Sequence, residues 1–304
     1  MLFMMRYVLG FDGGGTKTEC VLMNSADQVL ARTYAGPSNP FRIGVESAAH
    51  AVNEAASLAL EDAGVSRAVV VAVGAGLAGT ASPELKEGMR AALAETFPGA
   101  AITVLTDLEA ALVAAGEGPG IVLVAGTGSA AIGRNARNEV LRAGGYGPHS
   151  SDQGSAFDIG RHAVIAAREE SVRSGGDSAL GREILAQLGY EDWQSLQSRA
   201  ESAPDDIYPK IFPVVTAMAD AGNSTACELL LGSVNPLCEL VGEVAGRLGL
   251  REQPMFLAKV GGMFGRSRFF DARLDAALKE VVPQAQERRL RISPAEAAAL
   301  AAKY

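Results

Sequence analysis

The layout of one short segment occurs twice in this chain. Near the start, an apolar stretch leads through "DGGGTKT" (12–18) into a second apolar stretch, a polar turn and a third strand-like stretch. Residues 120–148 repeat that order, with "GTGS" as the glycine turn. The segments "VLARTYAGPS" (29–38) and "VLRAGGYGPHS" (140–150) also match in part. The repetition predicts an internal duplication of a strand-rich α/β unit.

The rest of the chain supports two such units. A chain of 304 residues with 48% hydrophobic residues can bury more than one core. The patterns predict strands over 6–11, 18–23, 28–34, 67–76, 101–107 and 254–262, and helices over 44–63, 83–97, most of 154–249, a short stretch from Glu109, and a last helix from Ser293. We therefore expect an N-terminal lobe over 1–115, completed by the helix 293–304, and a C-terminal lobe with helical insertions over 116–292.

The two glycine turns are candidates for binding phosphate. Each turn lies between two strands of a presumed hairpin, where glycines leave the backbone N–H groups accessible to phosphate oxygens. Thr16, Thr127 and Ser129 add hydroxyl donors. A single turn of this kind is often only a hairpin turn, but one in each half predicts a phosphate clamp across a central cleft. Gly261 and Gly262 offer a third close approach, for a base or ribose.

Three other patterns resemble known sites but do not fit them. The first turn has no P-loop spacing, because Thr16 stands before Lys17. Gly74, Gly76 and Gly79 form a literal GxGxxG, yet no acid ends the following strand at the distance that a nicotinamide dinucleotide needs. His50, His149 and His162 lack the spacing of metal ligands. We interpret the glycines as a tight turn and the histidines as ordinary surface or core residues.

Together, the motifs resemble the actin/hexokinase/Hsp70 superfamily, and within it the N-acetylglucosamine kinase family that includes the ATPase activators of benzoyl-coenzyme A reductase. "DGGGTKT" and "AGTGS" are similar to that family's two phosphate motifs, and "VGG" (260–262) to its adenosine motif. "GPSN" (36–39), "TD" (106–107) and "GGYGPHSSDQGSA" (144–156) resemble its sugar-site segments. The resemblance spans the chain and implies a duplicated actin-like ATPase (ribonuclease H-like) α/β fold, with two lobes and a central ATP and sugar cleft.

The resemblance also implies the function and the site. It implies an ATP-dependent kinase that phosphorylates the 6-hydroxyl of N-acetylglucosamine with Mg²⁺ as cofactor. The implied nucleotide-site residues are Asp12, Gly13, Gly14, Gly15, Thr16, Lys17, Thr127, Gly128, Gly261 and Gly262. The implied sugar-site residues are Asn39, Asp107, Ser129, Gly145, Tyr146, Asp152 and Ala156.

Four of these residues admit a second interpretation. Asp12 resembles the acid that holds hydrated Mg²⁺, although an Asp before Gly is also a common turn residue. Asp107 resembles the family's general base, but a residue between a strand and a helix can simply be an N-cap. Lys17 either neutralises phosphate charge or is a solvated lysine on an edge strand. For Asp152, the alternative to binding sugar is capping a helix that begins near Gly154.

The sugar-binding segment departs from the family pattern. The family commonly has "GWG…GDEGS" where this chain has "GYG…SDQGS", so Tyr146, Ser151 and Gln153 replace Trp, Gly and Glu. Glucosamine and N-acetylmuramic acid therefore remain alternative substrates. An ATPase activator is a further alternative, and it would need cysteines placed to ligate iron. A non-catalytic sugar sensor would not need Asp107 and both phosphate turns.

Charge and cysteine content restrict the partners. A net charge of −8 argues against a broad nucleic-acid-binding surface. The three scattered cysteines favour a reducing cytoplasm over a disulfide framework or a structural zinc. The apolar start is broken by Arg6 and does not resemble a signal peptide, and we find no apolar run long enough for a membrane span. The expected partners are an amino sugar and a second copy of the chain in a homodimer.

Overall fold

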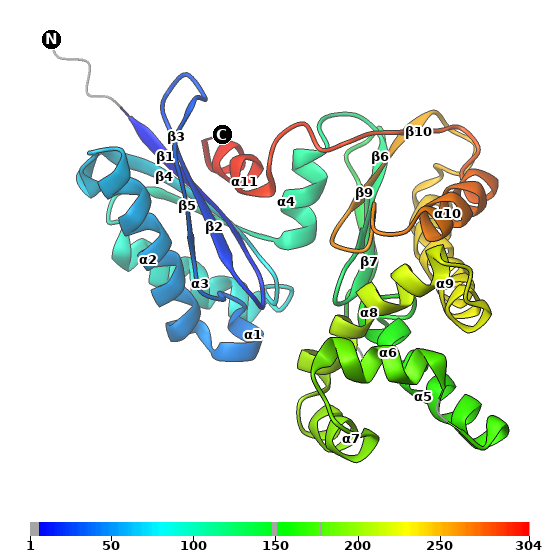
Figure 1. The fold of residues 1–304 in the computed structure, drawn as a ribbon. Helices are drawn as coiled ribbons and strands as arrows, with labels where there is room; N and C mark the ends of the chain where they lie inside the picture. Colours follow the sequence, from blue (N-terminus) through cyan, green and yellow to red (C-terminus); the bar gives the residue numbers. More distant parts are fainter. Residues whose placement is uncertain (1–5, 148–150, 177, 304) are drawn as a thin grey trace, which may run out of the picture. The chain divides into compact units, whose positions relative to one another are not determined.

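The computed structural model describes residues 6–147, 151–176 and 178–303. The chain divides into two compact units, which are described separately. Unit 1 comprises Met1–Glu117 and Leu290–Tyr304, and unit 2 comprises Gly118–Arg289. The boundaries expected from the sequence were 115/116 and 292/293. The C-terminal segment therefore returns to the unit in which the chain begins (Figure 1).

Unit 1 is built on a five-stranded mixed sheet with the order β3-β2-β1-β4-β5. The bounds are β1 Tyr7–Gly13, β2 Thr18–Met23, β3 Val29–Ala35, β4 Val70–Leu77 and β5 Ala101–Thr106. The first three strands form an antiparallel meander, and β4 and β5 run parallel to β1. The carboxyl ends of β1, β4 and β5 thus lie at one edge of the sheet, where open α/β sheets bind ligands.

Helices cover both faces of the unit 1 sheet (Figure 1). α2 (Val45–Asp62) and α3 (Pro83–Thr96) pack on one face, and α4 (Asp107–Ala114) and α11 (Pro294–Lys303) pack on the other. The alanine-rich α11 approaches the strands closely. A Cβ at Gly10 would lie 2.0 Å from the carbonyl oxygen of Ala295, and one at Gly74 would lie 1.8 Å from that of Ala298. Both glycines are required by this contact between helix and sheet.

Unit 2 repeats the topology of unit 1. Its sheet has the order β10-β9-β6-β7-β8, with an antiparallel meander β6-β7-β8 and two strands parallel to β6. The bounds are β6 Gly120–Ala125, β7 Ser129–Arg134, β8 Val140–Gly144, β9 Met255–Val260 and β10 Ala285–Glu287. If β1 to β5 are replaced in turn by β6 to β10, the strand order of unit 1 becomes that of unit 2 read from its other end. The predicted duplication is therefore confirmed.

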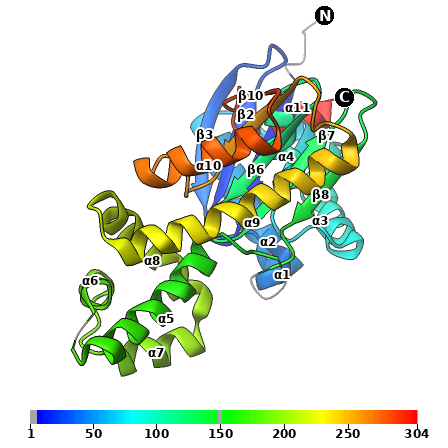
Figure 2. The ribbon, with the colours of Figure 1, turned by 90° about the vertical axis from the view of Figure 1, so that its right-hand side faces the viewer.

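Most helices of unit 2 lie between β8 and β9 in the chain. Their bounds are α5 Ala156–Ser174, α6 Ala179–Leu188, α7 Trp193–Ser202, α8 Pro204–Asp220 and α9 Ser224–Leu248, and α10 (Arg268–Val281) follows β9. α9 packs on β6, β7 and β8 and beside α10, whereas α5, α6 and α7 gather around α8 (Figure 2). These helices and one face of the sheet enclose the core of unit 2.

Several details differ from the sequence expectations. A short helix, α1 (Pro40–Ile43), and the strand β10 had not been expected. α9 is long and apolar enough to cross a membrane by length and composition, but half of its apolar window is buried inside the protein. At the start of the last helix, the N–H of Glu296 donates to Ser293 Oγ, and the Glu296 carboxylate pairs with Arg32.

Candidate functional site

The first glycine turn joins β1 to β2 and is tied to the segment after β3. Within the turn, the N–H of Gly14 donates to the carbonyl of Lys17 at 3.1 Å, and the N–H of Ser38 donates to the carbonyl of Gly14 at 3.0 Å. Gly15, Thr16 and Lys17 are exposed. The turn is thus fixed at its base and open at its tip, as a phosphate-binding turn requires.

The glycines of this turn have different surroundings. A Cβ at Gly13 would lie 2.0 Å from Ser38 Oγ and 2.7 Å from Leu77 Cδ2, so this position has no room for a side chain. A Cβ at Gly14 would have no atom within 4 Å. Gly13 is therefore required by packing, whereas Gly14 leaves open space beside the backbone for a ligand.

Asp12 and Asp107 lie at the same edge of the unit 1 sheet. Asp12 pairs in register with Gly76 on β4, which pairs with Leu105 on β5, two residues before Asp107. Gly76, on the strand between them, has no room for a side chain, because a Cβ there would lie 2.5 Å from the Ala110 Cβ of α4. Burial raises the pKa of Asp12 to about 6, with further contributions from Asp107 and Glu19 that outweigh the opposing effect of Lys17. The negative charge of Asp107 therefore acts on Asp12.

Thr106, and not Asp107, caps helix α4. Thr106 Oγ1 accepts a hydrogen bond from the N–H of Glu109 at 3.1 Å, and Glu109 Oε2 accepts one from the N–H of Thr106 at 2.8 Å. This reciprocal pair is a complete capping box. Asp107 is the first residue of the helix, so the N-cap interpretation of Asp107 is wrong. The assignment of Asp107 as a general base stays a prediction.

Asn39 has a structural role that the sequence did not indicate. Its side-chain oxygen accepts hydrogen bonds from the N–H groups of Phe41 and Arg42, at 3.0 and 3.3 Å, and so caps α1. A Cβ at Gly79 would lie 2.1 Å from that same oxygen. The predicted contact between Asn39 and sugar would have to use the rest of the amide, and it stays a prediction.

Two basic side chains lie beside the first turn. Lys17 Nζ lies over the Tyr34 ring, 4.9 Å from its centroid. Arg42 reaches the turn from α1, and its Nη1 would lie 3.4 Å from a Cβ placed on Gly15. Arg42 was not among the residues predicted from the sequence. No local pattern could have indicated it, because 26 residues separate it from Thr16.

The second glycine turn, between β6 and β7 of unit 2, is held by the start of α5. The N–H groups of Ala156 and Phe157 donate to the carbonyls of Gly126 and Thr127, at 2.9 and 3.3 Å. The N–H of Gly126 donates to the carbonyl of Gly128 at 2.9 Å. The carbonyls of the turn bond to the helix, while Thr127 itself is exposed. This is the arrangement that a phosphate-binding turn needs.

The predicted adenosine motif lies beside the same turn. β9 runs parallel to β6, and a Cβ at Gly261 would lie 2.2 Å from the carbonyl oxygen of Ala125 at the end of β6. Gly261 has a φ of 121°, which also favours glycine. Gly262 is exposed, and a Cβ placed there would have no atom within 4 Å. The structure of unit 2 thus brings the second and third glycine motifs together.

Asp152 packs directly on the second turn. Its Oδ2 would lie 2.7 Å from a Cβ at Gly128, and the residue is only 8% exposed. The N-cap of α5 is Ser155, whose Oγ accepts a hydrogen bond from the N–H of Asp158 at 3.2 Å. The alternative in which Asp152 caps this helix is therefore wrong. Ser129 lies nearby, and its Oγ donates to the carbonyl of Gln153 at 2.9 Å.

The remaining predicted sugar-site residues differ in exposure. Gly145 follows β8, and its N–H donates to the carbonyl of Ser129 at 3.0 Å. Tyr146 is 60% exposed, with Arg142 over its ring at 4.5 Å from the centroid. Ala156 is buried and belongs to the core of unit 2. Its methyl group therefore contributes to packing, and a role beside the C2 substituent of a sugar stays a prediction.

The donor set at the edge of unit 1 fits a hydrated Mg²⁺ ion. Among the described residues, no group of three or more His, Cys, Asp or Glu side chains could enclose a metal ion. Mg²⁺, however, keeps most of its water and is held by one or two carboxylates together with substrate phosphates. Burial is the main cause of the raised pKa of Asp12, and the negative charges of Asp107 and Glu19 add to it; a divalent cation would offset those charges.

The other sequence motifs have structural explanations. Gly74 and Gly76 allow α11 and α4 to approach the sheet, and Gly79, with a φ of 85°, lies against Asn39. His50 is exposed, and His162 Nδ1 lies 3.0 Å from the carbonyl of Asp158. His149 lies outside the described residues. Gly74 and Gly76 lie inside β4, so the interpretation of the GxGxxG as a tight turn is wrong for these two glycines and holds for Gly79.

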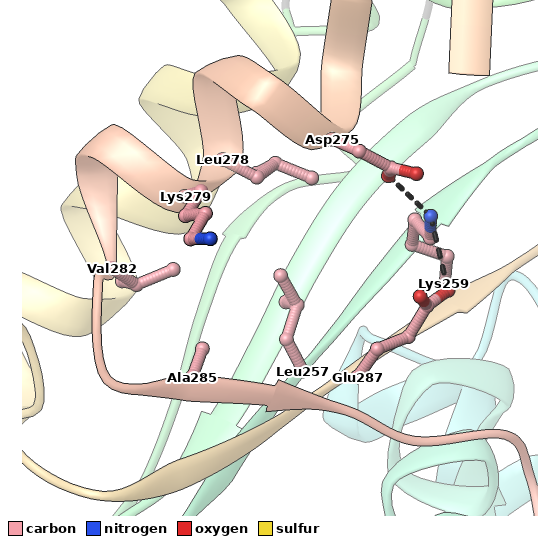
Figure 3. Close-up of a pocket in the computed structure, with 8 residues that line it drawn as sticks. All are labelled: Leu257, Lys259, Asp275, Leu278, Lys279, Val282, Ala285 and Glu287. Carbon is pink, nitrogen blue, oxygen red and sulfur yellow. Dashed lines mark hydrogen bonds and ion pairs between the residues drawn. The ribbon is translucent and has the colours of Figure 1, made fainter. Parts of the chain in front are cut away.

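Two hollows in unit 2 lie away from the predicted site residues. One, of about 270 Å³, lies between α10, β9 and β10 (Figure 3). Lys259 crosses its rim to Asp275 and Glu287, and hydrogen bonds to these acids raise the pKa of Lys259 against the effect of burial. The other, of about 440 Å³, lies between α5 and α9. None of the predicted site residues lines either hollow.

Comparison with known proteins assigns the family. The model of the BadF/BadG/BcrA/BcrD ATPase family matches residues 9–302. The chain belongs to this ATPase family. An N-acetyl-D-glucosamine kinase from Dictyostelium discoideum is 27% identical to this chain, and the alignment covers 97% of this chain and 97% of the relative. An N-acetylmuramic acid/N-acetylglucosamine kinase from Clostridium acetobutylicum is 28% identical over 87% of this chain and 88% of the relative. The glucosamine kinase GspK from Vibrio cholerae is 29% identical over 74% and 76%.

Solved structures establish the fold of this ATPase-family member. A Chromobacterium violaceum protein assigned as an N-acetylglucosamine kinase superposes with a TM-score of 0.77, with 24% identity and coverage of 98% of this chain and 99% of that one. A ROK family glucokinase from Streptomyces griseus, solved with glucose and AMPPNP, gives a TM-score of 0.63 at 18% identity, with coverage of 98% and 99%. The predicted duplicated actin-like ATPase fold is thus confirmed.

Proposed function

We propose that this family member is an ATP-dependent amino-sugar kinase that phosphorylates the 6-hydroxyl of N-acetylglucosamine. The observation that carries the proposal is the placement of Asp12 and Asp107 at one sheet edge, with Gly76 between them and the open Gly14 turn beside them. Phosphoryl transfer needs mainly positioning and charge neutralisation, and these groups can supply both.

Each residue has a proposed role. Asp107 accepts the proton of the sugar hydroxyl, and because Thr106 caps α4, the helix does not require the Asp107 carboxylate as its cap. The turns at Gly14 and Thr127 supply backbone and hydroxyl donors to phosphate oxygens. Asp12 would hold Mg²⁺ through water, and Mg²⁺ would neutralise charge on the β- and γ-phosphates.

The proposed sugar specificity rests on the relatives of this chain. By name, the Dictyostelium relative acts on N-acetylglucosamine and the Vibrio relative on glucosamine. The name of the Clostridium relative includes both N-acetylmuramic acid and N-acetylglucosamine. Two of the three names include N-acetylglucosamine, which is why we propose it first. Glucosamine and N-acetylmuramic acid are the alternatives, because Tyr146, Ser151 and Gln153 depart from the family's common pattern. We further propose a cytoplasmic homodimer.

A role as an ATPase activator is disfavoured by the thiols. An iron–sulfur cluster needs cysteine thiolates as ligands. Cys20 is fully buried in β2, and Cys238 is buried in α9. Burial raises the pKa of both thiols, that of Cys238 to about 11 with help from Glu280 and Glu239. Both side chains are therefore suited to packing.

A coupled assay of ADP release tests the proposal. Glucose, glucosamine, N-acetylglucosamine, N-acetylmannosamine and N-acetylmuramic acid are compared at equal concentration with MgATP. We expect the highest kcat/KM with N-acetylglucosamine and phosphate on its 6-oxygen by NMR. A higher kcat/KM with another sugar would replace the proposed substrate, and ADP release that no sugar increases would contradict the kinase function.

A further inference from the structure

The Arg42 guanidinium lies against the first phosphate turn. A Cβ placed on Gly15 would lie 3.4 Å from Arg42 Nη1 and 3.7 Å from Cδ and Cζ, so the end of the arginine rests beside the Gly15 backbone. Gly15 and Arg42 are both exposed, and Gly14 next to them has open space at its Cα. A guanidinium in this place can reach an anion bound at the turn.

The backbone that carries Arg42 is fixed by several contacts. The Asn39 side chain caps α1 by accepting from the N–H of Arg42, and the N–H of Arg42 also lies 3.1 Å from the Asn39 carbonyl. Pro40, at the first helical position, is buried. Asn39 in turn fits against Gly79 after β4. α1 is short, but it is anchored to the sheet that carries the turn.

Lys17 is less suited to the same role. It belongs to the turn by sequence, but its ammonium group lies over the exposed Tyr34 ring of β3. Arginine also presents several N–H donors in a planar fork that matches two phosphate oxygens, whereas a lysine ammonium is a single charged point.

We propose that Arg42 binds the terminal phosphates of ATP at the first turn, in the role that the sequence suggested for Lys17. This inference rests on the proposed function in that it takes ATP as the nucleotide. Arg42 belongs to unit 1, as do Asp12 and the turn, so the contact needs only the structure of that unit.

Nucleotide binding without sugar tests Arg42 separately from the kinase reaction. Calorimetric titrations with MgAMPPNP, MgADP and AMP compare wild type with Arg42→Gln, Arg42→Lys and the matched control Arg90→Gln, an exposed arginine of α3 that pairs with Glu87. We expect Arg42→Gln to weaken MgAMPPNP binding by about tenfold or more, the scale of a charge-assisted hydrogen bond, and to leave AMP binding unchanged. Arg42→Lys should restore part of the loss, and Arg90→Gln should change the affinity by less than about threefold. Melting curves should show all variants folded, because Arg42 is exposed.

The outcomes separate this inference from the proposed function. If wild type binds MgAMPPNP and Arg42→Gln binds it equally well, Arg42 is not a phosphate ligand, whatever sugar is phosphorylated. If Arg42→Gln loses MgAMPPNP affinity while no sugar is phosphorylated, the inference stands and the kinase function fails. If wild type does not bind MgAMPPNP, both fail. A rise in KM confined to N-acetylmuramic acid would overturn the inference and assign Arg42 to the sugar's carboxylate.

Discussion

Asp12 on β1 and Glu19 on β2 are cross-strand partners, directly opposite each other in the antiparallel register. Like charges in this relationship destabilise a strand pair. Glu19 is compensated by Arg32, which also pairs with Glu296 of α11. Asp12 instead has a raised pKa of about 6. The charge of Glu19 is thus compensated within the protein, whereas Asp12 is the acid that we propose to hold Mg²⁺.

Asp12→Asn should stabilise the ligand-free protein at neutral pH. An acid whose pKa is raised from 3.8 to about 6 on folding lowers the free energy of unfolding progressively as pH rises through that window, and the full penalty is present above it. Asn removes the penalty, which amounts to at most about 3 kcal/mol. Urea unfolding should therefore show a gain at pH 7.5 and little change below pH 4. The exposed Asp62→Asn serves as the control, and a loss of stability at pH 7.5 would contradict the argument.

Asp107→Asn should lower kcat by about a hundredfold or more while the protein stays folded. The helix keeps its cap, because Thr106 and Glu109 form the capping box. Steady-state kinetics and a melting curve are measured together. The matched variant Thr106→Ala should cost about 1 kcal/mol of stability and retain most of the activity. An Asp107→Asn enzyme with a near wild-type rate would remove Asp107 from the reaction.

Asp152→Ala should raise the KM for sugar by about tenfold or more and leave the KM for ATP nearly unchanged. The reason is that a buried carboxylate against Gly128 can offer a sugar hydroxyl a charge-assisted hydrogen bond. Ser155→Ala removes the actual cap of α5 and should cost about 1 kcal/mol of stability without a change in sugar KM. Equal effects of the two variants on sugar KM would assign Asp152 a structural role.

Gly13→Ala and Gly14→Ala should have opposite consequences. A methyl group at position 13 would overlap Ser38 and Leu77, so we expect a loss of about 1–3 kcal/mol in the free energy of unfolding. A methyl group at position 14 enters open space, so stability should hold while the KM for ATP rises. Urea unfolding and ATP titrations check both. A stable Gly14→Ala variant with an unchanged KM for ATP would show that phosphate does not approach there.

Gly74→Ala tests the structural interpretation of the GxGxxG pattern. The added Cβ would meet the backbone of α11, so we expect a loss of about 3 kcal/mol of stability, at the upper end for an overpacked core. Gly36→Ala, whose Cβ would have no neighbour within 4 Å, is the control and should be nearly neutral. A stable Gly74→Ala protein with weakened nucleotide binding would instead favour a ligand-binding role for this glycine.

Much of the fold could be predicted because its signals are local. Strand and helix periodicity, the two glycine turns and the repeated order of elements are all contained in short segments of sequence. The duplication followed from comparing two such segments, and the two sheets do share one strand order. Asp12 and Asp107 were also identifiable, because each stands where an apolar strand ends. The short polar β10 was missed because three residues, "AQE", carry no strand signal until β9 pairs with them.

The assignment of roles within the site depended on the tertiary structure. The sequence could not distinguish Asp107 from a helix cap, whereas the hydrogen bonds of Thr106 and Glu109 decide it. It likewise left the role of Lys17 open, whereas the structure places the Lys17 ammonium over the Tyr34 ring and brings Arg42 to Gly15. By itself the sequence determined most of the helices and strands and where they repeat, because those properties depend on neighbouring residues. Which side chain occupies a given space was decided only by contacts between residues far apart in the chain, and such contacts leave no local pattern.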